Sequence, residues 1–167
     1  ERIKTLDANA DVTTFGQELN PETYAIAKAD TMIRGGNPDN MALGSTLSKD
    51  AFSGYTFDYL ISNPPFGIDW KKDQNAVKEE AELGENGRFG AGLPKISDGQ
   101  LLFQLNGIDK LKDTGRMAII HNGSALFSGN AGGGESAIRE YVIMNDWLEA
   151  IIQLPTDLFF DLHLDYH

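Results

Sequence analysis

Short apolar runs separated by amphipathic stretches dominate the pattern of hydrophobic and polar positions. Apolar runs bounded by polar or turn-forming residues are typical of buried strands, and here they occupy residues 12–19, 41–43, 57–62, 117–120 and 148–154. The stretches between them have apolar residues at helical spacing. Strands that alternate with helices favour an α/β fold with a mostly parallel sheet.

The first predicted helix has clear start and stop signals. Asn20 is a favourable N-cap, and Pro21 at the first helical position has the backbone angle that a helix needs. The pair Gly35-Gly36 ends the helix. Its apolar side chains form one helical stripe of the kind that faces a core; they are Ala25, Ile26, Ala29, Met32 and Ile33.

Two further helices are predicted in the second half of the chain. One begins at Ser97 or Asp98, buries the stripe Leu101, Leu105 and Ile108 as core, and ends at residues 113–115. The other covers residues 137–144. The strand over residues 117–120 lies between these two helices.

Residues 67–99 break this regular pattern. The segment is charged and contains several glycines, and only a possible short helix around residues 76–83 interrupts it. Long structureless loops in compact domains are usually functional or disordered. One interpretation is a lid or a surface for DNA or partner subunits, with contacts from Trp70, Lys71, Lys72, Arg88 and Phe89. The other is a mobile insertion.

Composition narrows the class of protein. With 167 residues, 41% hydrophobic and 23% charged, the chain fits one globular domain. No apolar stretch approaches the roughly 20 residues that cross a bilayer, and the N-terminus has no signal-peptide pattern, so we expect no membrane association. The absence of cysteine excludes disulfides and thiolate metal ligands and fits a cytoplasmic location. The three histidines are scattered, and we predict no metal site.

The formal net charge of −11 limits how the chain could bind DNA. Proteins that grip a DNA backbone alone usually present a basic face, because phosphate neutralisation supplies much of the affinity. Here the only basic cluster is Lys71-Lys72. We therefore expect that the chain does not hold DNA unaided.

The tetrapeptide Asn63-Pro64-Pro65-Phe66 is the strongest candidate for chemistry. It follows the predicted strand 57–62, and open α/β sheets bind ligands at the carboxyl ends of their strands. The Asn63 amide oxygen and the Pro64 carbonyl could accept both hydrogens of an amine on a heteroaromatic ring, which localises its nitrogen lone pair. Pro65 keeps that carbonyl rigid without adding a donor, and Phe66 offers a stacking face. The alternative is a structural turn with Phe66 in the core.

The tetrapeptide and its surroundings resemble a known family. Asn-Pro-Pro-[Phe/Tyr/Trp] after a strand is the catalytic motif of S-adenosylmethionine-dependent amino-methyltransferases. The stretches around it are similar to the modification subunit of type I restriction–modification systems. They are Phe15-Gly16-Gln17-Glu18-Leu19-Asn20-Pro21 with Tyr24, Ala27 and Lys28, then Gly44-Ser45-Thr46-Leu47, Phe57-Asp58, Gly115-Arg116-Met117-Ala118-Ile119-Ile120, Asn122-Gly123, Leu126-Phe127, Ile138-Arg139 and Ile152-Gln153-Leu154-Pro155.

The resemblance implies a fold and a function. The expected fold is a three-layer, Rossmann-like methyltransferase sheet. The expected activity is transfer of a methyl group from S-adenosylmethionine to the N6 amine of adenine in DNA. The catalytic residues that the resemblance implies are Asn63, Pro64, Pro65 and Phe66. A separate specificity subunit would read the DNA sequence, and a restriction subunit would complete the complex.

The resemblance also implies cofactor contacts. It places the ribose-binding acid at Glu18 and puts Asn63 beside the cofactor. Ser45 stands where the family often has an adenine-binding aspartate, and a serine accepts a hydrogen bond more weakly than a carboxylate. From spacing alone, Glu18 could equally be a solvated glutamate near a helix N-terminus.

Parts of the family pattern are not found in this sequence. No glycine-rich turn precedes Glu18, and residues after Pro155 do not resemble the family's final hairpin strand. We therefore expect residues 1–160 to form a partial methyltransferase domain, followed by a tail over 161–167. A missing first strand would leave a gap between the strands that end at Glu18 and Asn63, and residues 1–167 alone would then bind the cofactor weakly or not at all.

Two other functions remain open. The same amine chemistry would serve an adenine in RNA or the amide of a protein glutamine. A non-catalytic scaffold that docks on specificity or nuclease subunits is the second alternative, and the acidic charge and the absent glycine-rich turn favour it for this chain in isolation.

Overall fold

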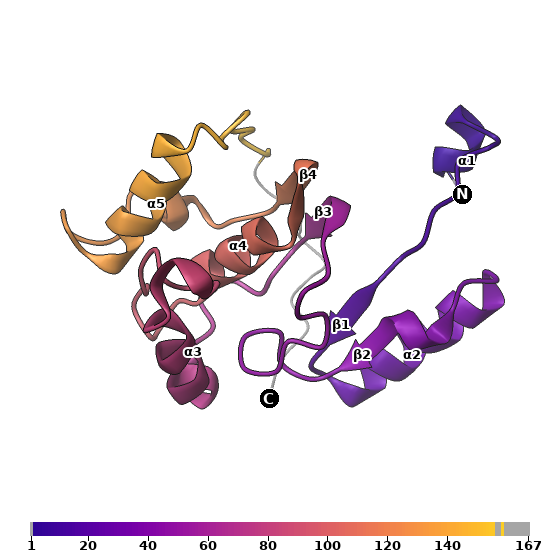
Figure 1. The fold of residues 1–167 in the computed structure, drawn as a ribbon, viewed down its shortest axis with the longest axis horizontal. Helices are drawn as coiled ribbons and strands as arrows, with labels where there is room; N and C mark the ends of the chain where they lie inside the picture. Colours follow the sequence, from indigo (N-terminus) through magenta and orange to yellow (C-terminus); the bar gives the residue numbers. More distant parts are fainter. Residues whose placement is uncertain (1, 156–157, 159–167) are drawn as a thin grey trace.

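Every strand pairing in the computed structural model is parallel, which confirms the α/β prediction (Figure 1). The structure describes residues 2–155 and residue 158. Strand β1 (Gly16–Glu18) pairs with β2 (Met41–Leu43), and β3 (Phe57–Ser62) pairs with β4 (Leu111–Ile119). Within the described residues no pairing joins these two sheets, as expected for an incomplete sheet.

The helices connect and cover these strands. They are α1 (Arg2–Leu6), α2 (Pro21–Ile33), α3 (Gln74–Ala81), α4 (Gln100–Asp109) and α5 (Gly134–Met144), with short 3-10 turns over Pro38–Asn40, Lys71–Asp73, Gly84–Asn86 and Gly123–Leu126. Helix α2 contacts β1 and β2, and α4 contacts β4 and α5. No helix in the described part of the chain is long and apolar enough to span a membrane.

Helix α2 begins as predicted but presents the opposite face to the sheet. The Asn20 side chain accepts the backbone N–H groups of Glu22 and Thr23, which confirms the N-cap. The predicted core stripe is exposed, with Ile26 at 71% and Ile33 at 84%. The half-buried side of the helix carries Tyr24, Ala27, Lys28 and Thr31 instead. Helical spacing marked the apolar face correctly, but that face has no partner among the described residues.

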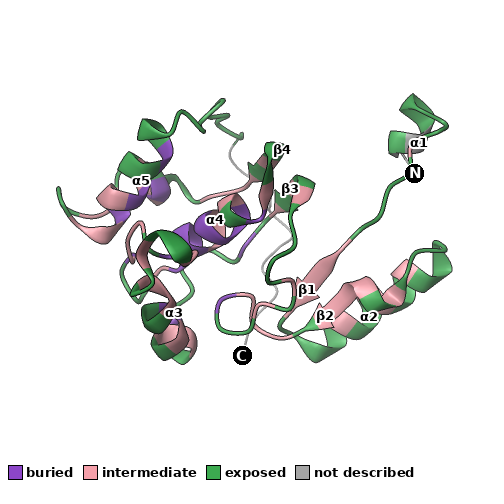
Figure 2. Cartoon of the chain, in the orientation of Figure 1, coloured by how far each residue is buried: buried purple, intermediate pink, exposed green. Residues whose placement is uncertain are grey.

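The core of the molecule lies around α3, α4 and α5 (Figure 2). Leu101, Leu102 and Leu105 are buried, as predicted for this helix. Segment 67–99 is part of the same core, because Trp70 and Phe89 are 3% and 0% exposed. The prediction that Trp70 and Phe89 contact DNA or partner subunits is therefore wrong. Their large apolar surfaces are removed from water instead, which stabilises the fold.

Three predicted element boundaries are wrong. Residues 148–154 form no strand, since they have no hydrogen-bonded neighbour among the described residues. Of residues 12–19, only Gly16–Glu18 pair in a sheet. The predicted helix end at residues 113–115 lies inside β4, because α4 already stops at Asp109. Strand β4 has more residues than β3 at this point, and a register shift between Phe57 and Tyr59 accommodates them.

Strands β3 and β4 are covered on one face only. On the covered face, Leu60 and Met117 lie against Gly107 of α4. On the other face, Tyr59 is 76% and Ile61 88% exposed. Parallel sheets are normally covered on both faces, so the bare face agrees with a sheet that is incomplete in this chain.

Candidate functional site

The Asn63-Pro64-Pro65-Phe66 tetrapeptide lies directly at the carboxyl end of β3. The last bond of the sheet runs from the Ile120 N–H to the Ser62 carbonyl at 3.0 Å, and the two prolines then prevent further pairing. Pro64 is buried, whereas Asn63 and Pro65 are exposed and Phe66 is 39% exposed. The alternative that Phe66 fills the core is wrong. The Asn63 amide and the Phe66 ring are both accessible to a ligand.

Glu18 ends β1 and faces the start of α2. Its Oε1 accepts the backbone N–H of Asn20 at 2.7 Å, which fixes the carboxylate at the carboxyl edge of the β1–β2 sheet. The residue is half-buried. No hydrogen bond to its second oxygen, Oε2, occurs within the described residues. Glu18 therefore supports the start of α2 and still has one carboxylate oxygen for a ligand hydroxyl.

Ser45 lies beside Glu18 on the loop that follows β2. The N–H of Gly44 donates to the Glu18 carbonyl at 2.9 Å, so the loop leaves the sheet next to the end of β1. Ser45 is half-buried, and its Oγ accepts the Leu47 N–H at 3.3 Å. The structure thus brings the two predicted nucleoside contacts together, because parallel strands end at the same edge.

Gln17 is a residue of this region that the sequence analysis did not single out. Its Nε2 donates to the carbonyls of Gly44 at 3.2 Å and Lys49 at 2.7 Å, and its Oε1 accepts the Ala51 N–H at 3.1 Å. One side chain in β1 therefore shapes the loop that carries Ser45. Its place next to Glu18, within the family-like stretch of residues 15–21, was the sequence signal that could have pointed to it.

Glu18 and Ser45 belong to one sheet, and the Asn63–Phe66 tetrapeptide belongs to the other. Within residues 2–155, no hydrogen bond connects the tetrapeptide with either of them. The β1–β2 sheet and the β3–β4 sheet are connected instead through the segment that links β2 to β3. In this segment Asp50 forms a buried ion pair with Lys110 at 2.5 Å, and Lys110 also donates to the Phe52 carbonyl at 3.2 Å.

Arg88 is not available to bind DNA. Its side chain is 7% exposed and forms a two-bond ion pair with Glu80, at 2.7 and 2.6 Å. Burial would raise the pKa of Glu80, but the hydrogen bonds and charge of Arg88 outweigh burial and hold that pKa below its ordinary value. The prediction of a DNA contact is therefore wrong for Arg88. Lys71 and Lys72 are exposed, and for these two it stays a prediction.

His121 follows β4 but has the features of a packing residue. Its Nδ1 lies 3.3 Å from Gln100 Oε1, which also accepts the Asn122 N–H at 3.0 Å. The His121 Nε2 is buried without a hydrogen-bond partner in the described part of the chain. Burial lowers the pKa of His121, and the charge of Asp98 opposes this only in part. The ring is therefore held neutral within a structural network.

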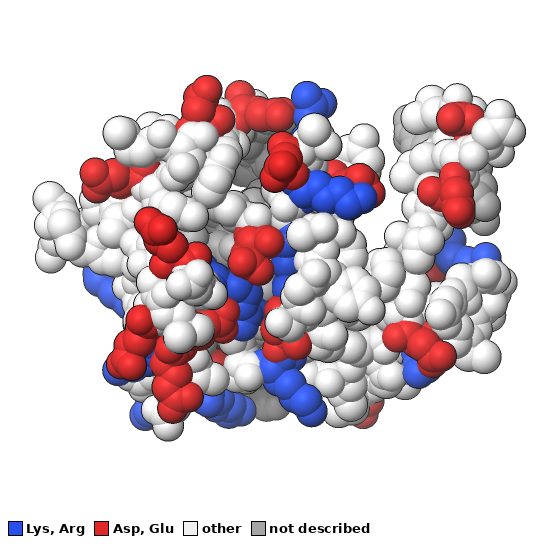
Figure 3. All heavy atoms as spheres, in the orientation of Figure 1, with Lys and Arg blue, Asp and Glu red and all other residues white. Residues whose placement is uncertain are grey.

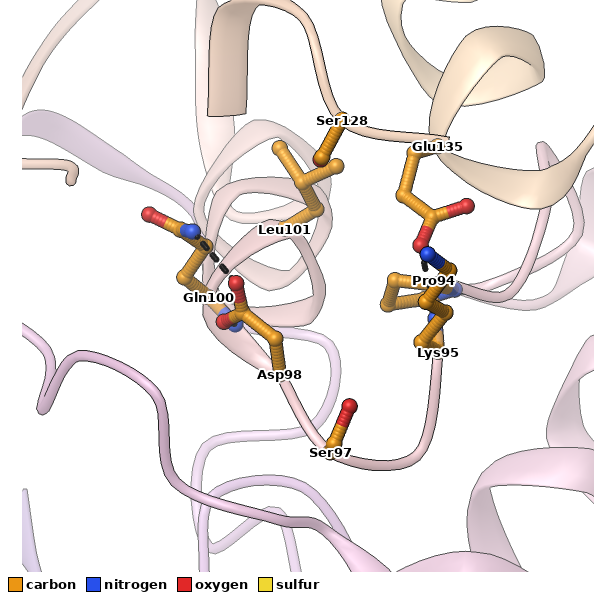
Figure 4. A pocket seen from close by; sticks show the side chains of 8 residues that line it. All are labelled: Pro94, Lys95, Ser97, Asp98, Gln100, Leu101, Ser128 and Glu135. Atoms are coloured by element: carbon orange, nitrogen blue, oxygen red, sulfur yellow. Dashed lines mark hydrogen bonds between the residues drawn. The ribbon is translucent and has the colours of Figure 1, made fainter. Parts of the chain in front are cut away.

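A small cavity of about 190 Å³ lies between the turn before α4 and the start of α5 (Figure 4). Its lining residues are Pro94, Lys95, Ser97, Asp98, Gln100, Leu101, Ser128 and Glu135. The Glu135 carboxylate accepts the Lys95 N–H at 3.0 Å, and Gln100 donates to Asp98 at 2.7 Å. None of the predicted catalytic or cofactor residues lines this cavity.

On the one face of the molecule that Figure 3 draws, the charged side chains are of mixed sign. On the face drawn in Figure 3, Lys and Arg side chains are scattered among Asp and Glu and form no continuous patch. This agrees with the net charge of −11. A DNA duplex held by this face alone would gain little phosphate neutralisation.

The sequence and the fold are similar to those of known methylases. Residues 1–165 match the family described as N-6 DNA Methylase. The chain is 28% identical to the type I restriction enzyme MjaIX methylase subunit of Methanocaldococcus jannaschii, over 95% of this chain and 27% of that protein. It also matches the MpnII methylase subunit of Mycoplasma pneumoniae at 29% identity, over 89% of this chain and 28% of that protein.

Two solved structures share the fold. The methyltransferase subunit of a type I restriction–modification system from Streptococcus thermophilus matches with a TM-score of 0.73 and 32% identity, over 90% of this chain and 31% of that one. The M protein of the type I restriction enzyme EcoKI matches with a TM-score of 0.55 and 27% identity, over 77% and 24%. The chain thus spans about a quarter to a third of these proteins.

Proposed function

The chain belongs to the N-6 DNA methylase family, and from this premise we propose that the protein containing it transfers a methyl group from S-adenosylmethionine to the N6 amine of adenine in DNA. The observation that carries the proposal is the accessible Asn63 amide and Phe66 ring at the carboxyl end of β3. The similarity to type I methylase subunits over most of the chain supports the same substrate.

Glu18 and Ser45 fit the nucleoside end of the cofactor. The half-buried Glu18 has a carboxylate oxygen for a ribose hydroxyl, and Ser45 can accept from the exocyclic amine of adenine. When bound, S-adenosylmethionine supplies the methyl group as part of a sulfonium.

Asn63 and Pro64 act on the target amine. The Asn63 Oδ1 and the Pro64 carbonyl each accept a hydrogen bond from one N–H of the adenine N6 amine. These two bonds keep the lone pair of the N6 nitrogen from delocalising into the ring. Phe66 stacks on an adenine that has left the duplex. These residues bind and orient the base and form no covalent bond with it, so their contribution to catalysis is positioning.

DNA binding requires further subunits in this proposal. The chain is acidic, and the face drawn in Figure 3 has no basic patch, so in this proposal a specificity subunit supplies the contacts to the DNA backbone and a restriction subunit completes the complex. A cytoplasmic location, where cellular DNA is accessible, belongs to the same proposal.

A methyl-transfer assay on the full-length protein with its specificity subunit tests the proposed substrate. Tritiated S-adenosylmethionine is incubated with DNA, RNA or protein, and the label in each is counted. We expect label in DNA, recovered as N6-methyladenine after digestion. Label confined to RNA or protein would identify one of the alternative substrates. Binding of the specificity subunit without any transfer would support the scaffold alternative instead.

A further inference from the structure

Arg88 uses every hydrogen-bond donor of its guanidinium inside the protein. Its Nε and one Nη2 hydrogen go to the Glu80 carboxylate, and the other Nη2 hydrogen goes to the Leu47 carbonyl at 3.2 Å. Its two Nη1 hydrogens go to the carbonyl of Thr46 and the side chain of Asn106, both at 2.8 Å. An arginine has five such donors, and all are satisfied here.

These bonds join three parts of the chain that are far apart in sequence. Glu80 lies half-buried on α3, and Asn106 is buried on α4. Thr46 and Leu47 lie on the loop after β2, one and two residues beyond Ser45. Leu47 is itself buried in that core. Arg88 therefore ties the loop that carries Ser45 to the helices of the other half of the molecule.

We propose that Arg88 is a positioning residue for the adenine-binding side of the cofactor site. It holds the carbonyls of Thr46 and Leu47 and thereby fixes Ser45, while Gln17 holds the same loop from β1. The inference rests on the proposed function, since it assigns Ser45 to the adenine of S-adenosylmethionine. It gives segment 67–99 a role in cofactor binding that its sequence did not indicate.

The role requires the geometry of arginine and not only its charge. A lysine at this position would keep a positive charge beside Glu80. Its three N–H donors are all on one nitrogen, however, so they cannot reach the carboxylate, the two carbonyls and the Asn106 amide at the same time. Arg88→Lys should therefore loosen the loop that carries Ser45 while leaving the Glu80 carboxylate paired with a positive charge.

The experiment measures ligand binding to the full-length protein by calorimetry, with S-adenosylhomocysteine and S-inosylhomocysteine as probes. The two ligands differ at the purine, where a carbonyl replaces the exocyclic amine. The variants are Arg88→Lys and, as a matched control, Arg139→Lys. Arg139 also donates to two loop carbonyls, those of Ala125 at 3.2 Å and Ser128 at 2.8 Å, but it does not touch the Ser45 loop.

We expect Arg88→Lys to raise the Kd for S-adenosylhomocysteine by up to about tenfold, the effect of losing the neutral hydrogen bond between the Ser45 hydroxyl and the exocyclic amine. The Kd for S-inosylhomocysteine should change little, so that the preference for adenine falls by about the same factor. Arg139→Lys should leave this preference unchanged. A second variant, Asn106→Ser, keeps both Arg88 and Glu80 and should reduce the preference in the same direction, by about threefold.

Three results would overturn the inference. The first is an unchanged preference for adenine in both Arg88→Lys and Asn106→Ser. The second is an equal loss of affinity for both ligands together with a lower melting temperature, because a purely structural role predicts that pattern. The third is wild-type protein that binds neither S-adenosylmethionine nor S-adenosylhomocysteine, which would also overturn the proposed function. In the first two cases wild-type binding leaves the proposed function intact.

Discussion

The ring of Phe15 packs against the ring of Phe57 with their centroids 5.3 Å apart. Phe15 directly precedes β1 and Phe57 begins β3, so this contact brings together the starts of two strands whose sheets are not hydrogen-bonded to each other in the described residues. Phe52 and Tyr55 complete the cluster, at 5.5 and 5.8 Å from Phe15. The cluster holds the two sheets together at the end opposite Glu18 and Asn63.

Removal of the Phe57 ring should therefore weaken the connection between the sheets. We expect Phe57→Ala to lower the free energy of unfolding by about 2–3 kcal/mol. This is just below the loss for a fully buried phenylalanine, because Phe57 is only half-buried. Phe57→Leu, which keeps an apolar side chain, should cost less. Urea unfolding of the full-length protein measures both. Equal stability of wild type and Phe57→Ala would show that the cluster does not join the sheets.

Glu18 should bind the cofactor through its carboxylate charge. Glu18→Gln keeps an acceptor for the Asn20 N–H but loses the charge, and Glu18→Ala loses both. We expect the Kd for S-adenosylmethionine to rise about tenfold in Glu18→Gln and more in Glu18→Ala. Glu22→Gln, on the exposed first turn of α2, is the control and should bind normally. Wild-type affinity in Glu18→Ala would show that Glu18 serves only the start of the helix.

Phe66 should act on the base and not on the cofactor. Stacking of a base on an aromatic side chain is worth about 1–3 kcal/mol, so Phe66→Ala should lower kcat/KM for DNA by about tenfold to a hundredfold. Phe66→Tyr keeps the stacking face and should retain most of the activity. Fluorescence of 2-aminopurine placed at the target base reports the stacking directly. Normal kcat/KM in Phe66→Ala would contradict this role.

The ion pair of Glu80 and Arg88 should make stability depend on acid pH. The pKa of Glu80 is lowered in the folded protein, so below its ordinary value of 4.5 the unfolded chain binds more protons than the folded one. The stabilisation from Glu80 is complete above that pH and is lost as the pH falls through the lowered pKa. Glu80→Gln should therefore be less stable than wild type at pH 7, and the difference should shrink toward pH 3. A difference that stays constant over this range would exclude the ion pair as its source.

Local sequence signals predicted the elements that depend on neighbouring residues. Asn20 and Pro21 set the start of α2 through their own backbone, and the two prolines after Ser62 set the end of β3. Each of these features needs only a few consecutive residues.

Features that depend on distant partners could not be predicted in this way. Arg88 looked like a surface cation because its partners Glu80, Thr46 and Asn106 come together only in the fold. Residues 148–154 have the apolar pattern of a strand, but a strand also needs a neighbour to pair with, and the described structure provides none. The exposed stripe of α2 shows the same limit, since periodicity identifies an apolar face without identifying what covers it.

In the proposed mechanism Asn63 lies beside the cofactor and activates the amine of the target adenine. The most direct test is the rate of N6-methyladenine formation in DNA by Asn63→Ala in the full-length protein, measured beside its affinity for S-adenosylmethionine. Asn75→Ala, an exposed asparagine on α3, is the matched control. We predict a fall in kcat of about a hundredfold or more with cofactor affinity within about twofold of wild type. Methylation by Asn63→Ala at the wild-type rate would exclude Asn63 as the residue that activates the amine.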